Sequence, residues 1–218
     1  MDVYYPESDI REFFDLLAQF NINYVLAHNI DNELPSKLEK GKDIDIIVKP
    51  SDYLCYQKVM LSHGYRRIMH PLGRENGWEF LYNMHESSKF SHKSSGLLID
   101  SYAELATKSI GTNAWLPLDK TIQESIWQDK VWNESERWWQ LDDKNLLIHL
   151  VTRCIFEKEI FSESYIKEIE KLAPLLDDCN VQRKMEKIFW RFTDVLIKML
   201  RRKCYASIVS SYLTYVDY

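Results

Sequence analysis

Glycine is scarce in this sequence, with six residues among 218. Loops that bind phosphate through backbone amides usually need glycine, because a residue without a Cβ atom lets the backbone approach the ligand closely. The patterns G-x-x-x-x-G-K-[ST], G-x-G-x-x-G and G-x-S-x-G are all absent. The sequence therefore gives no support to a P-loop NTPase, a dinucleotide-binding domain or an α/β-hydrolase.

Cysteine pairs and long apolar runs are missing as well. The four cysteines, Cys55, Cys154, Cys179 and Cys204, lie far apart and form no C-x-x-C pair, so they favour buried free thiols over a zinc or redox site. The N-terminal segment lacks the basic and apolar regions of a signal peptide. No stretch approaches the roughly 18 apolar residues of a membrane span. We therefore expect a cytoplasmic protein.

Positive charge is not in excess, which narrows the range of partners. The 28 lysine and arginine residues face 33 aspartate and glutamate residues, and the formal net charge is −5. A general nucleic-acid binder normally has a basic domain with a basic face. The balance therefore argues against general nucleic-acid binding, although it leaves room for a small local phosphate site.

Helical and strand-like segments alternate up to about residue 117, and from about residue 120 the pattern is helix-like almost throughout. We therefore expect a mixed α/β (α+β) fold, with an α/β domain over residues 1–117 and a helical domain over residues 118–218. Ser8 and Ser162 are candidate helix caps. The expected helices cover residues 8–20, 51–63, 142–160, 163–172 and 181–204; the expected strands cover 22–27, 43–48, 65–69, 78–84 and 96–100, with a polar loop over 85–95.

Two acidic residues, Asp43 and Asp45, alternate with apolar residues in the segment DIDIIV. Strand side chains alternate between faces, so both carboxylates point to the same side of the sheet. Burial of two carboxylates together is costly, and a divalent cation relieves that cost. Mg²⁺ prefers oxygen ligands and commonly binds one or two carboxylates together with substrate phosphates. Asp100, at the end of the apolar segment GLLID, is placed to add a third carboxylate.

Simpler interpretations exist for these acids. Asp43 and Asp45 also suit a strand that enters from a loop with solvated carboxylates, and a strand-end aspartate such as Asp100 often begins a turn or caps a helix. The pair His85-Glu86 begins the zinc-protease pattern H-E-x-x-H, but position 89 is lysine, so that pattern fails.

The segments KDIDIIV and LLID resemble the strand motifs of the DNA polymerase β-like nucleotidyltransferase superfamily. The downstream stretch LDDKNLLIHLVTRCIFEKEIFSESYIKEIEKL is similar to the helical half of stand-alone bacterial members, some of which sit among surface-polysaccharide genes. The resemblance covers most of the chain. It implies a small mixed-sheet nucleotidyltransferase domain followed by a helical domain, with the substrate in the cleft between them.

The resemblance also implies an activity: Mg²⁺- or Mn²⁺-dependent transfer of a nucleoside monophosphate from a nucleoside triphosphate to an unidentified acceptor. The acceptor is a sugar, a small molecule or a protein, with surface-polysaccharide metabolism as one setting. Asp43 and Asp45 then hold the metal that bridges the triphosphate, and Asp100 holds a second metal and helps to deprotonate the acceptor. Pyrophosphate leaves, and the protein contributes mainly positioning and charge neutralisation.

One segment departs from the family pattern. Members normally have Gly-Gly or Gly-Ser after the first strand, where this chain has Leu26-Ala27-His28-Asn29. Asn29 can supply a side-chain donor to the triphosphate, and Lys42 or Lys37 can supply a charge. Lys158 either reaches a phosphate from the cleft or is a surface lysine. Arg153 precedes Lys158 by five residues, so the two need not share a helix face.

Two further residue types have ordinary interpretations. His28 suits a loop or packing histidine better than a catalytic base. The tryptophans at positions 127, 132, 138 and 139 are expected to pack the helical half onto the sheet.

Because the glycine motif is missing, two rival hypotheses stay open. The first is a catalytically degenerate nucleotidyltransferase fold that binds a nucleotide or a protein partner. The second is transfer of another phosphorylated group by the same acids.

Overall fold

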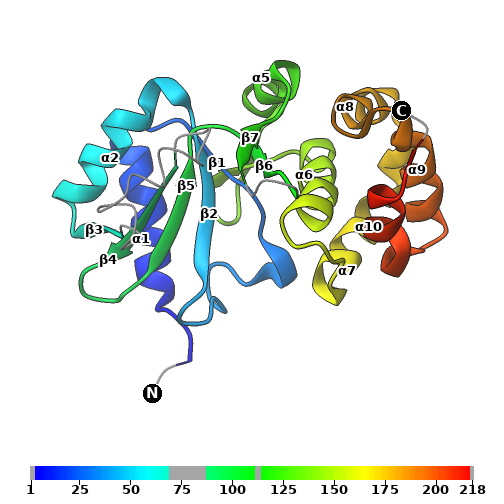
Figure 1. Ribbon diagram of the computed structural model, residues 1–218. Helices are drawn as coiled ribbons and strands as arrows, with labels where there is room; N and C mark the ends of the chain where they lie inside the picture. The colour runs from blue at the N-terminus through cyan, green and yellow to red at the C-terminus, as the bar shows by residue number, and fades with distance from the viewer. Residues whose placement is uncertain (1–2, 69–86, 111–113, 217–218) are drawn as a thin grey trace.

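The computed structural model describes residues 3–68, 87–110 and 114–216. Within these ranges a seven-stranded mixed sheet forms one side of the molecule, and a group of helices forms the other (Figure 1). The strand order is β3-β4-β5-β2-β1-β9-β8, and β6 and β7 form a separate pair. The strands are β1 (Tyr24–Leu26), β2 (Asp43–Val48), β3 (Tyr65–Ile68), β4 (Ser87–His92), β5 (Leu98–Tyr102), β6 (Ala106–Lys108), β7 (Trp115–Pro117), β8 (Val131–Asn133) and β9 (Trp138–Gln140).

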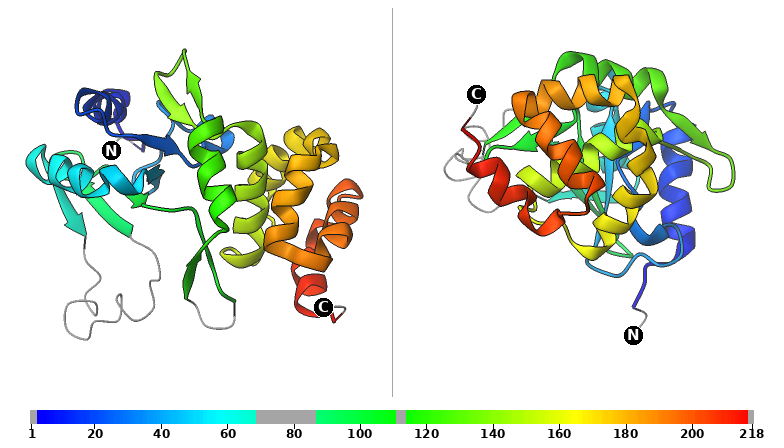
Figure 2. Two further views of the ribbon diagram at one scale, coloured as in Figure 1. Left: turned by 90° about the horizontal axis from the view of Figure 1, so that it is seen from above. Right: turned by 90° about the vertical axis from the view of Figure 1, so that its right-hand side faces the viewer.

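The helices fall into two groups. Helices α1 and α2 cover one face of the sheet, whereas the later helices lie on the side of its opposite face and beyond it (Figures 1 and 2). The α-helices are α1 (Glu7–Gln19), α2 (Tyr53–Ser62), α5 (Lys120–Asp129), α6 (Asp143–Phe156), α7 (Glu163–Leu172), α8 (Cys179–Phe189), α9 (Thr193–Arg201) and α10 (Tyr205–Leu213). Short 3-10 helices are η1 (Ile30–Asn32), η2 (Pro50–Asp52), η3 (Ala173–Asp177) and η4 (Trp190–Phe192).

Strand β2 has the alternation that its sequence predicts. Ile44, Ile46 and Val48 belong to the core that α1 and α2 close. Ile47 belongs to a different core, which includes residues of α5. Side chains two residues apart share a face, so Asp43 and Asp45 lie on the Ile47 side, toward the later helices.

The pairing register brings further charged residues to that face. β2 and β5 are parallel, with Asp45 opposite Asp100. β4 and β5 are antiparallel, with Lys89 opposite Asp100. Directly opposed residues of neighbouring strands point to the same side of a sheet. The three carboxylates and the lysine therefore share one surface.

The polar segment 85–95 was wrongly expected to be a loop, because residues 87–92 form β4. Ser88 and Phe90 are buried and point away from Lys89, which is the alternation of a half-buried strand. Three of the six residues of this strand are serine, so its composition does not show the apolar–polar alternation of a strand. The strand expected over 78–84 lies outside the described residues.

The helix-like expectation after residue 120 is wrong for residues 131–140, which form a β-hairpin of β8 and β9. β9 pairs in parallel with β1 and extends the sheet. Trp138 is 1% exposed and packs on Phe14 of α1, with ring centroids 4.8 Å apart. Trp127 and Trp139 pack against the core on the other face, as expected of them. The domain division near residue 117 stays a prediction, and two strands that follow it belong to the sheet.

Several helices begin or end at other residues than their sequences predict. The long helix expected over 181–204 is broken into α8, η4 and α9, because Trp190 has a φ angle of +48°. Ser8 lies inside the first turn of α1 and does not cap it, and Ser162 precedes α7 without a side-chain capping bond. Asp142 and Asp178 do cap α6 and α8.

The expectation of buried thiols holds for one cysteine. Cys154 on α6 is buried, whereas Cys55, Cys179 and Cys204 are exposed. The exposed three lie on the outer side of a helix or beside a helix terminus, where neighbouring elements do not cover them. No helix among the described residues is long and apolar enough to cross a membrane.

Candidate active site

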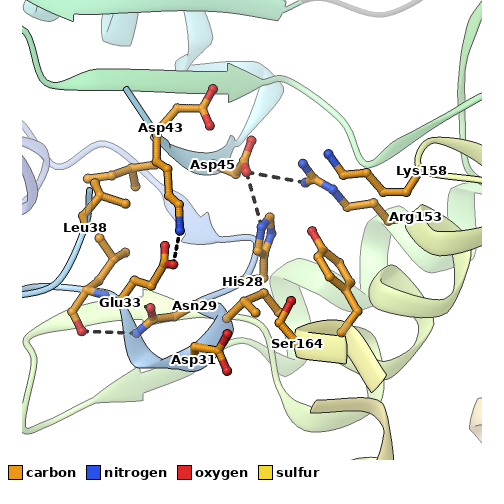
Figure 3. A pocket seen from close by; sticks show the side chains of 15 residues that line it. His28, Asn29, Asp31, Glu33, Leu38, Asp43, Asp45, Arg153, Lys158 and Ser164 are labelled. Atoms are coloured by element: carbon orange, nitrogen blue, oxygen red, sulfur yellow. Dashed lines mark hydrogen bonds and ion pairs between the residues drawn. The ribbon is translucent and has the colours of Figure 1, made fainter. Parts of the chain in front are cut away.

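A cavity of about 330 Å³ opens where β1 ends and β2 begins, beneath the C-terminal end of α6 (Figure 3). Its walls come from four parts of the chain: the segment after β1, the start of β2, the end of α6 and the start of α7. Both members of the predicted acidic pair line it. The polar and charged lining residues are His28, Asn29, Asp31, Glu33, Lys42, Asp43, Asp45, Arg153, Lys158, Ser164 and Tyr165.

Asp45 is the buried carboxylate of this cavity, with 7% of its surface exposed. Its Oδ1 accepts a hydrogen bond from the Tyr102 hydroxyl at 3.0 Å. Its Oδ2 lies 3.5 Å from Nη1 of Arg153 and 3.4 Å from Nε2 of His28 (Figure 3). A buried carboxylate needs such partners, because an isolated charge away from water is costly. Asp45 is therefore fixed by side-chain partners within the cavity and is not a solvated acid at a strand end.

Asp43 forms its ion pair with a different residue, Lys89. Nζ of Lys89 donates to its Oδ2 at 2.5 Å, and both side chains are about a third exposed. Burial by itself lowers the pKa of Lys89, but the hydrogen bond with Asp43 and the nearby carboxylates raise it, so the net shift is upward. Lys89 is thus a firmly charged ammonium beside the acidic pair. No local sequence pattern marks Lys89 as a site residue, because it lies in a serine-rich segment with the composition of a loop.

Asp100 lies beside Asp45 on the neighbouring strand without lining the cavity. Burial, followed by the negative charges of Asp45 and Asp43, raises its pKa to about 6. The ammonium of Lys89 and a hydrogen bond with Tyr102 act in the opposite direction. The raised pKa of Asp100 thus reflects its burial first and the two neighbouring carboxylates second.

The carboxylates of this site are chemically suited to a hard divalent cation. Three carboxylates on adjacent strands offer oxygen ligands of the type that Mg²⁺ and Mn²⁺ prefer. In the part of the chain that the structure describes, however, no three His, Cys, Asp or Glu side chains converge closely enough to hold an ion. Lys89 and Arg153 supply the neutralising charge instead. A metal would therefore compete with these two cations for the same carboxylates.

Arg153 is the main residue that sequence reasoning missed. Its side chain is 11% exposed and bridges Asp45 to Glu157, whose Oε1 lies 3.2 Å from Nη2. Burial lowers the pKa of Arg153, and Asp45, together with Tyr165, Glu157 and Tyr102, more than offsets that effect, so the guanidinium stays charged. The signal in the sequence was one arginine inside the apolar helix segment LLIHLVTRCIF.

Arg153 and Lys158 both line the cavity, although a five-residue spacing on one helix does not require a shared face (Figure 3). Helix α6 ends at Phe156, so Lys158 lies beyond the helix and no longer follows its period. Lys158 is 44% exposed, and its Nζ lies 3.3 Å from Oε1 of Glu157. Lys158 lines the cavity, and its contact with a phosphate stays a prediction.

His28 occupies a part of the site that its sequence did not predict. Burial, and then the charges of Arg153 and Lys158, lower its pKa to about 3, so the imidazole is neutral. Its ring lies 5.6 Å from the ring of buried His149, and its Nδ1 has no hydrogen-bond partner among the described residues. His28 therefore combines a packing role with contact to Asp45.

The remaining predicted phosphate contacts differ in their availability. The Asn29 side chain accepts from the backbone N–H of Leu34 at 3.0 Å and donates to its carbonyl at 3.4 Å, so it shapes the loop that follows β1. Lys42 lines the cavity and pairs with Glu33. Lys37 is exposed and is not among the lining residues.

No protein-family model matches this chain, and no curated protein matches its sequence. Several solved structures are nevertheless similar to this chain in fold. The solution structure of the antibiotic-resistance factor ANT(2'')-Ia is similar with a TM-score of 0.50 and 9% identity, over 90% of this chain and 97% of that one. The lincomycin-bound lincosamide antibiotic adenylyltransferase LnuA has a TM-score of 0.45 and 13% identity, over 78% and 97% of the two chains.

An antigenic nucleotidyltransferase-like protein from Paracoccidioides brasiliensis has a TM-score of 0.44 and 11% identity, over 93% of this chain and 95% of that one. At 9% identity, the similarity to ANT(2'')-Ia shows a shared fold and nothing about activity. It agrees with the mixed α/β architecture described above. This chain therefore shares its overall mixed α/β fold with ANT(2'')-Ia.

Proposed function

We propose that this protein is a nucleotidyltransferase that moves a nucleoside monophosphate from a nucleoside triphosphate to an acceptor hydroxyl, with Mg²⁺ or Mn²⁺ as cofactor. One observation carries the proposal. Asp43 and Asp45 face Arg153 and Lys158 across a single cavity of about 330 Å³. Carboxylates suit a divalent metal, and the two cations suit the phosphates that the metal neutralises only in part.

In the proposed mechanism, Asp43, Asp45 and Asp100 would hold the metal ions, which supply charge neutralisation at the phosphates. Arg153 and Lys158 bind phosphate oxygens and orient the triphosphate. The acceptor oxygen attacks the α-phosphorus and forms the new P–O bond, the bond to the β-phosphate oxygen breaks, and pyrophosphate leaves with that electron pair. Asp100 takes the proton of the acceptor hydroxyl.

Side chains replace the family's glycine loop in this proposal. His28 and Asn29 stand at the end of β1, and the Asn29 amide is bonded to Leu34, so little backbone is open for close contact with phosphate. Guanidinium and ammonium groups can bind phosphate from a greater distance than a backbone amide. Arg153, Lys158 and Lys42 are the lining residues that fit this role.

The acceptor class is a finer proposal. We infer a sugar hydroxyl in surface-polysaccharide metabolism, because the helical half resembles stand-alone bacterial members that sit among such genes. The base of the nucleotide is open to direct assay. Thermal shift with each of the four nucleoside triphosphates, with Mg²⁺ or Mn²⁺, should single out a stabilising ligand by mass action.

The direct test is pyrophosphate release with the nucleotide that this screen selects. Asp43→Asn and Asp45→Asn should each abolish turnover, since each removes a metal-binding charge. Asp194→Asn, on an exposed face of α9, is the matched control and should retain full activity. Full turnover in both site variants would disprove the assignment of this site.

A binding module without chemistry is the second candidate, and one observation favours it. Both acids of the pair already have cationic partners, Lys89 on Asp43 and Arg153 on Asp45. Calorimetry separates the two functions. Nucleotide binding without product at high protein concentration would favour the binding module, and product formation would exclude it.

A further inference from the structure

A second cavity, of about 560 Å³, lies at the opposite end of α6 from the candidate active site. α6 runs from Asp143 to Phe156, so about 20 Å of helix separates its two ends. Helices α5, α6 and α8 lie side by side (Figure 2), and residues on or beside all three line the cavity. Its charged lining consists of four cations and two carboxylates: Lys144, Arg183, Lys184, Lys187, Asp129 and Asp142.

Lys184 is the innermost cation of this cavity. Its side chain is 15% exposed, and its Nζ donates to Oδ1 of Asn145 at 2.9 Å. Asn145 is 1% exposed and also bonds Ser125 and the carboxylate of Asp142, so the lysine is held by a buried amide that its own neighbours fix in place. Its ion-pair partner Asp129 is 3.9 Å away, and burial lowers the pKa of the ammonium. Such a loosely paired, half-buried cation is stabilised by an anion.

Two of the other three cations of this cavity form ion pairs with nearby acids, and the third does not. Lys144 pairs with Asp178 at 2.8 Å and Lys187 with Asp119 at 2.9 Å, and these two acids do not line the cavity. Arg183, next to Lys184 in α8, has no hydrogen bond or ion pair within the described ranges. An unpaired guanidinium beside an incompletely neutralised ammonium is an arrangement that suits the oxygens of a phosphate.

We propose that this cavity is a binding site for a phosphorylated small polyol, with Arg183 and Lys184 on the phosphate. The cavity volume exceeds that of a bare phosphate and lies within the usual range of small-molecule sites. The Thr121 hydroxyl and the carboxylates of Asp129 and Asp142 line the remainder and bind ligand hydroxyls. The same carboxylates repel a ligand that is anionic throughout.

Calorimetric titration of the full chain tests this site, with EDTA present and no nucleotide. Glycerol 3-phosphate, inorganic phosphate and glycerol are the probes. Glycerol 3-phosphate should bind saturably and more tightly than phosphate, and glycerol should not bind. Loss of one charge-assisted contact in Arg183→Gln should raise the dissociation constant of glycerol 3-phosphate about tenfold or more. Arg202→Gln, an exposed arginine after α9, is the matched control and should bind as the wild type does.

Lys184→Gln should weaken binding at least as much as Arg183→Gln, provided that circular dichroism shows it folded. Arg183 is exposed, so its variant keeps the test decisive if Lys184→Gln does not fold. Unchanged affinity in Arg183→Gln, or the absence of saturable heat, would overturn the site. Equal affinity for phosphate and glycerol 3-phosphate would overturn the polyol assignment.

The site is independent of the proposed nucleotidyltransferase activity, and one further variant separates the two. Arg153→Gln should bind glycerol 3-phosphate normally, because Arg153 lies at the other end of α6. Binding that is lost in Arg153→Gln and retained in Arg183→Gln would place the ligand in the acidic cavity and refute this inference.

Discussion

Replacement of Lys89 by methionine should make metal binding tighter, although Lys89 is part of the site. Its ammonium lies 2.5 Å from Oδ2 of Asp43, so a divalent cation must displace it to use that oxygen. Methionine has nearly the same length and no charge. Most single changes near a functional site weaken binding, so an increase in affinity is a distinctive result.

The size of the effect follows from the exposure of the pair. Lys89 and Asp43 have side chains that are 39% and 30% exposed, so solvent screens their attraction. Exposed pairs contribute up to about 1 kcal/mol, which corresponds to roughly fivefold in a dissociation constant. We therefore expect the Mn²⁺ dissociation constant to fall about fivefold in Lys89→Met.

The assay is electron paramagnetic resonance of free Mn²⁺ during titration of the nucleotide-free protein. Lys93→Met, an exposed lysine in the turn of the same hairpin, is the control and should bind Mn²⁺ as the wild type does. Lys89→Arg keeps the charge and should not tighten binding. Asp43→Asn should weaken binding in both backgrounds, which ties the signal to this site. Unchanged or weaker binding in Lys89→Met would refute the idea that the ammonium and the metal compete.

Three further predictions concern stability. Arg153→Met leaves buried Asp45 without its guanidinium and should lower the free energy of unfolding in urea by about 3 kcal/mol, and Asp45→Asn in the same chain should restore part of the loss. Trp138→Ala should cost about 3–5 kcal/mol in the same assay, because Trp138 fills the core beneath the β8–β9 hairpin, whereas Trp132→Ala, at a 37%-exposed position, should cost far less. Asp119→Ala removes the cap of α5 and should cost about 1 kcal/mol near pH 7.

The Asp119 prediction has a pH dependence with a definite sign. Hydrogen bonds from Thr121 and Lys187 lower the pKa of Asp119 from 3.8 to about 2. A lowered folded-state pKa means that the stabilisation is fully present above about pH 4 and is lost as the pH falls toward 2. Urea denaturation of wild type and Asp119→Ala should therefore converge in that window. A gap between the two proteins that persists at pH 2 would contradict this origin of the cap's contribution.

Strand periodicity made the acidic half of the site predictable. Asp43 and Asp45 alternate with Ile44 and Ile46 over two repeats of the two-residue strand period. That alternation alone places both carboxylates on the same face of the sheet, without knowledge of the partner strands. Asp100 could be joined to them because it ends an apolar segment of the same kind. Their roles in metal binding stay predictions.

The basic half was not predictable in the same way. Lys89 reaches Asp43 only through the pairing of β4 with β5, in a strand whose serine-rich composition resembles a loop. Arg153 reaches Asp45 from 108 residues away, through the packing of α6 on the sheet. Contacts of this kind depend on tertiary structure, and no local pattern in a single sequence specifies them.

The missing glycine and the buried cations are two aspects of one arrangement. A histidine at position 28 places an imidazole against Asp45, where a glycine would leave open backbone. That imidazole is neutral, so it cannot neutralise the carboxylate, and the guanidinium of Arg153 does so from the helical half. The ion pair therefore joins α6 to β2 across the cavity. In the proposed function, Arg153 would leave Asp45 to a metal ion and would bind a phosphate at the same place, so that side-chain cations would do what backbone amides do in a glycine loop.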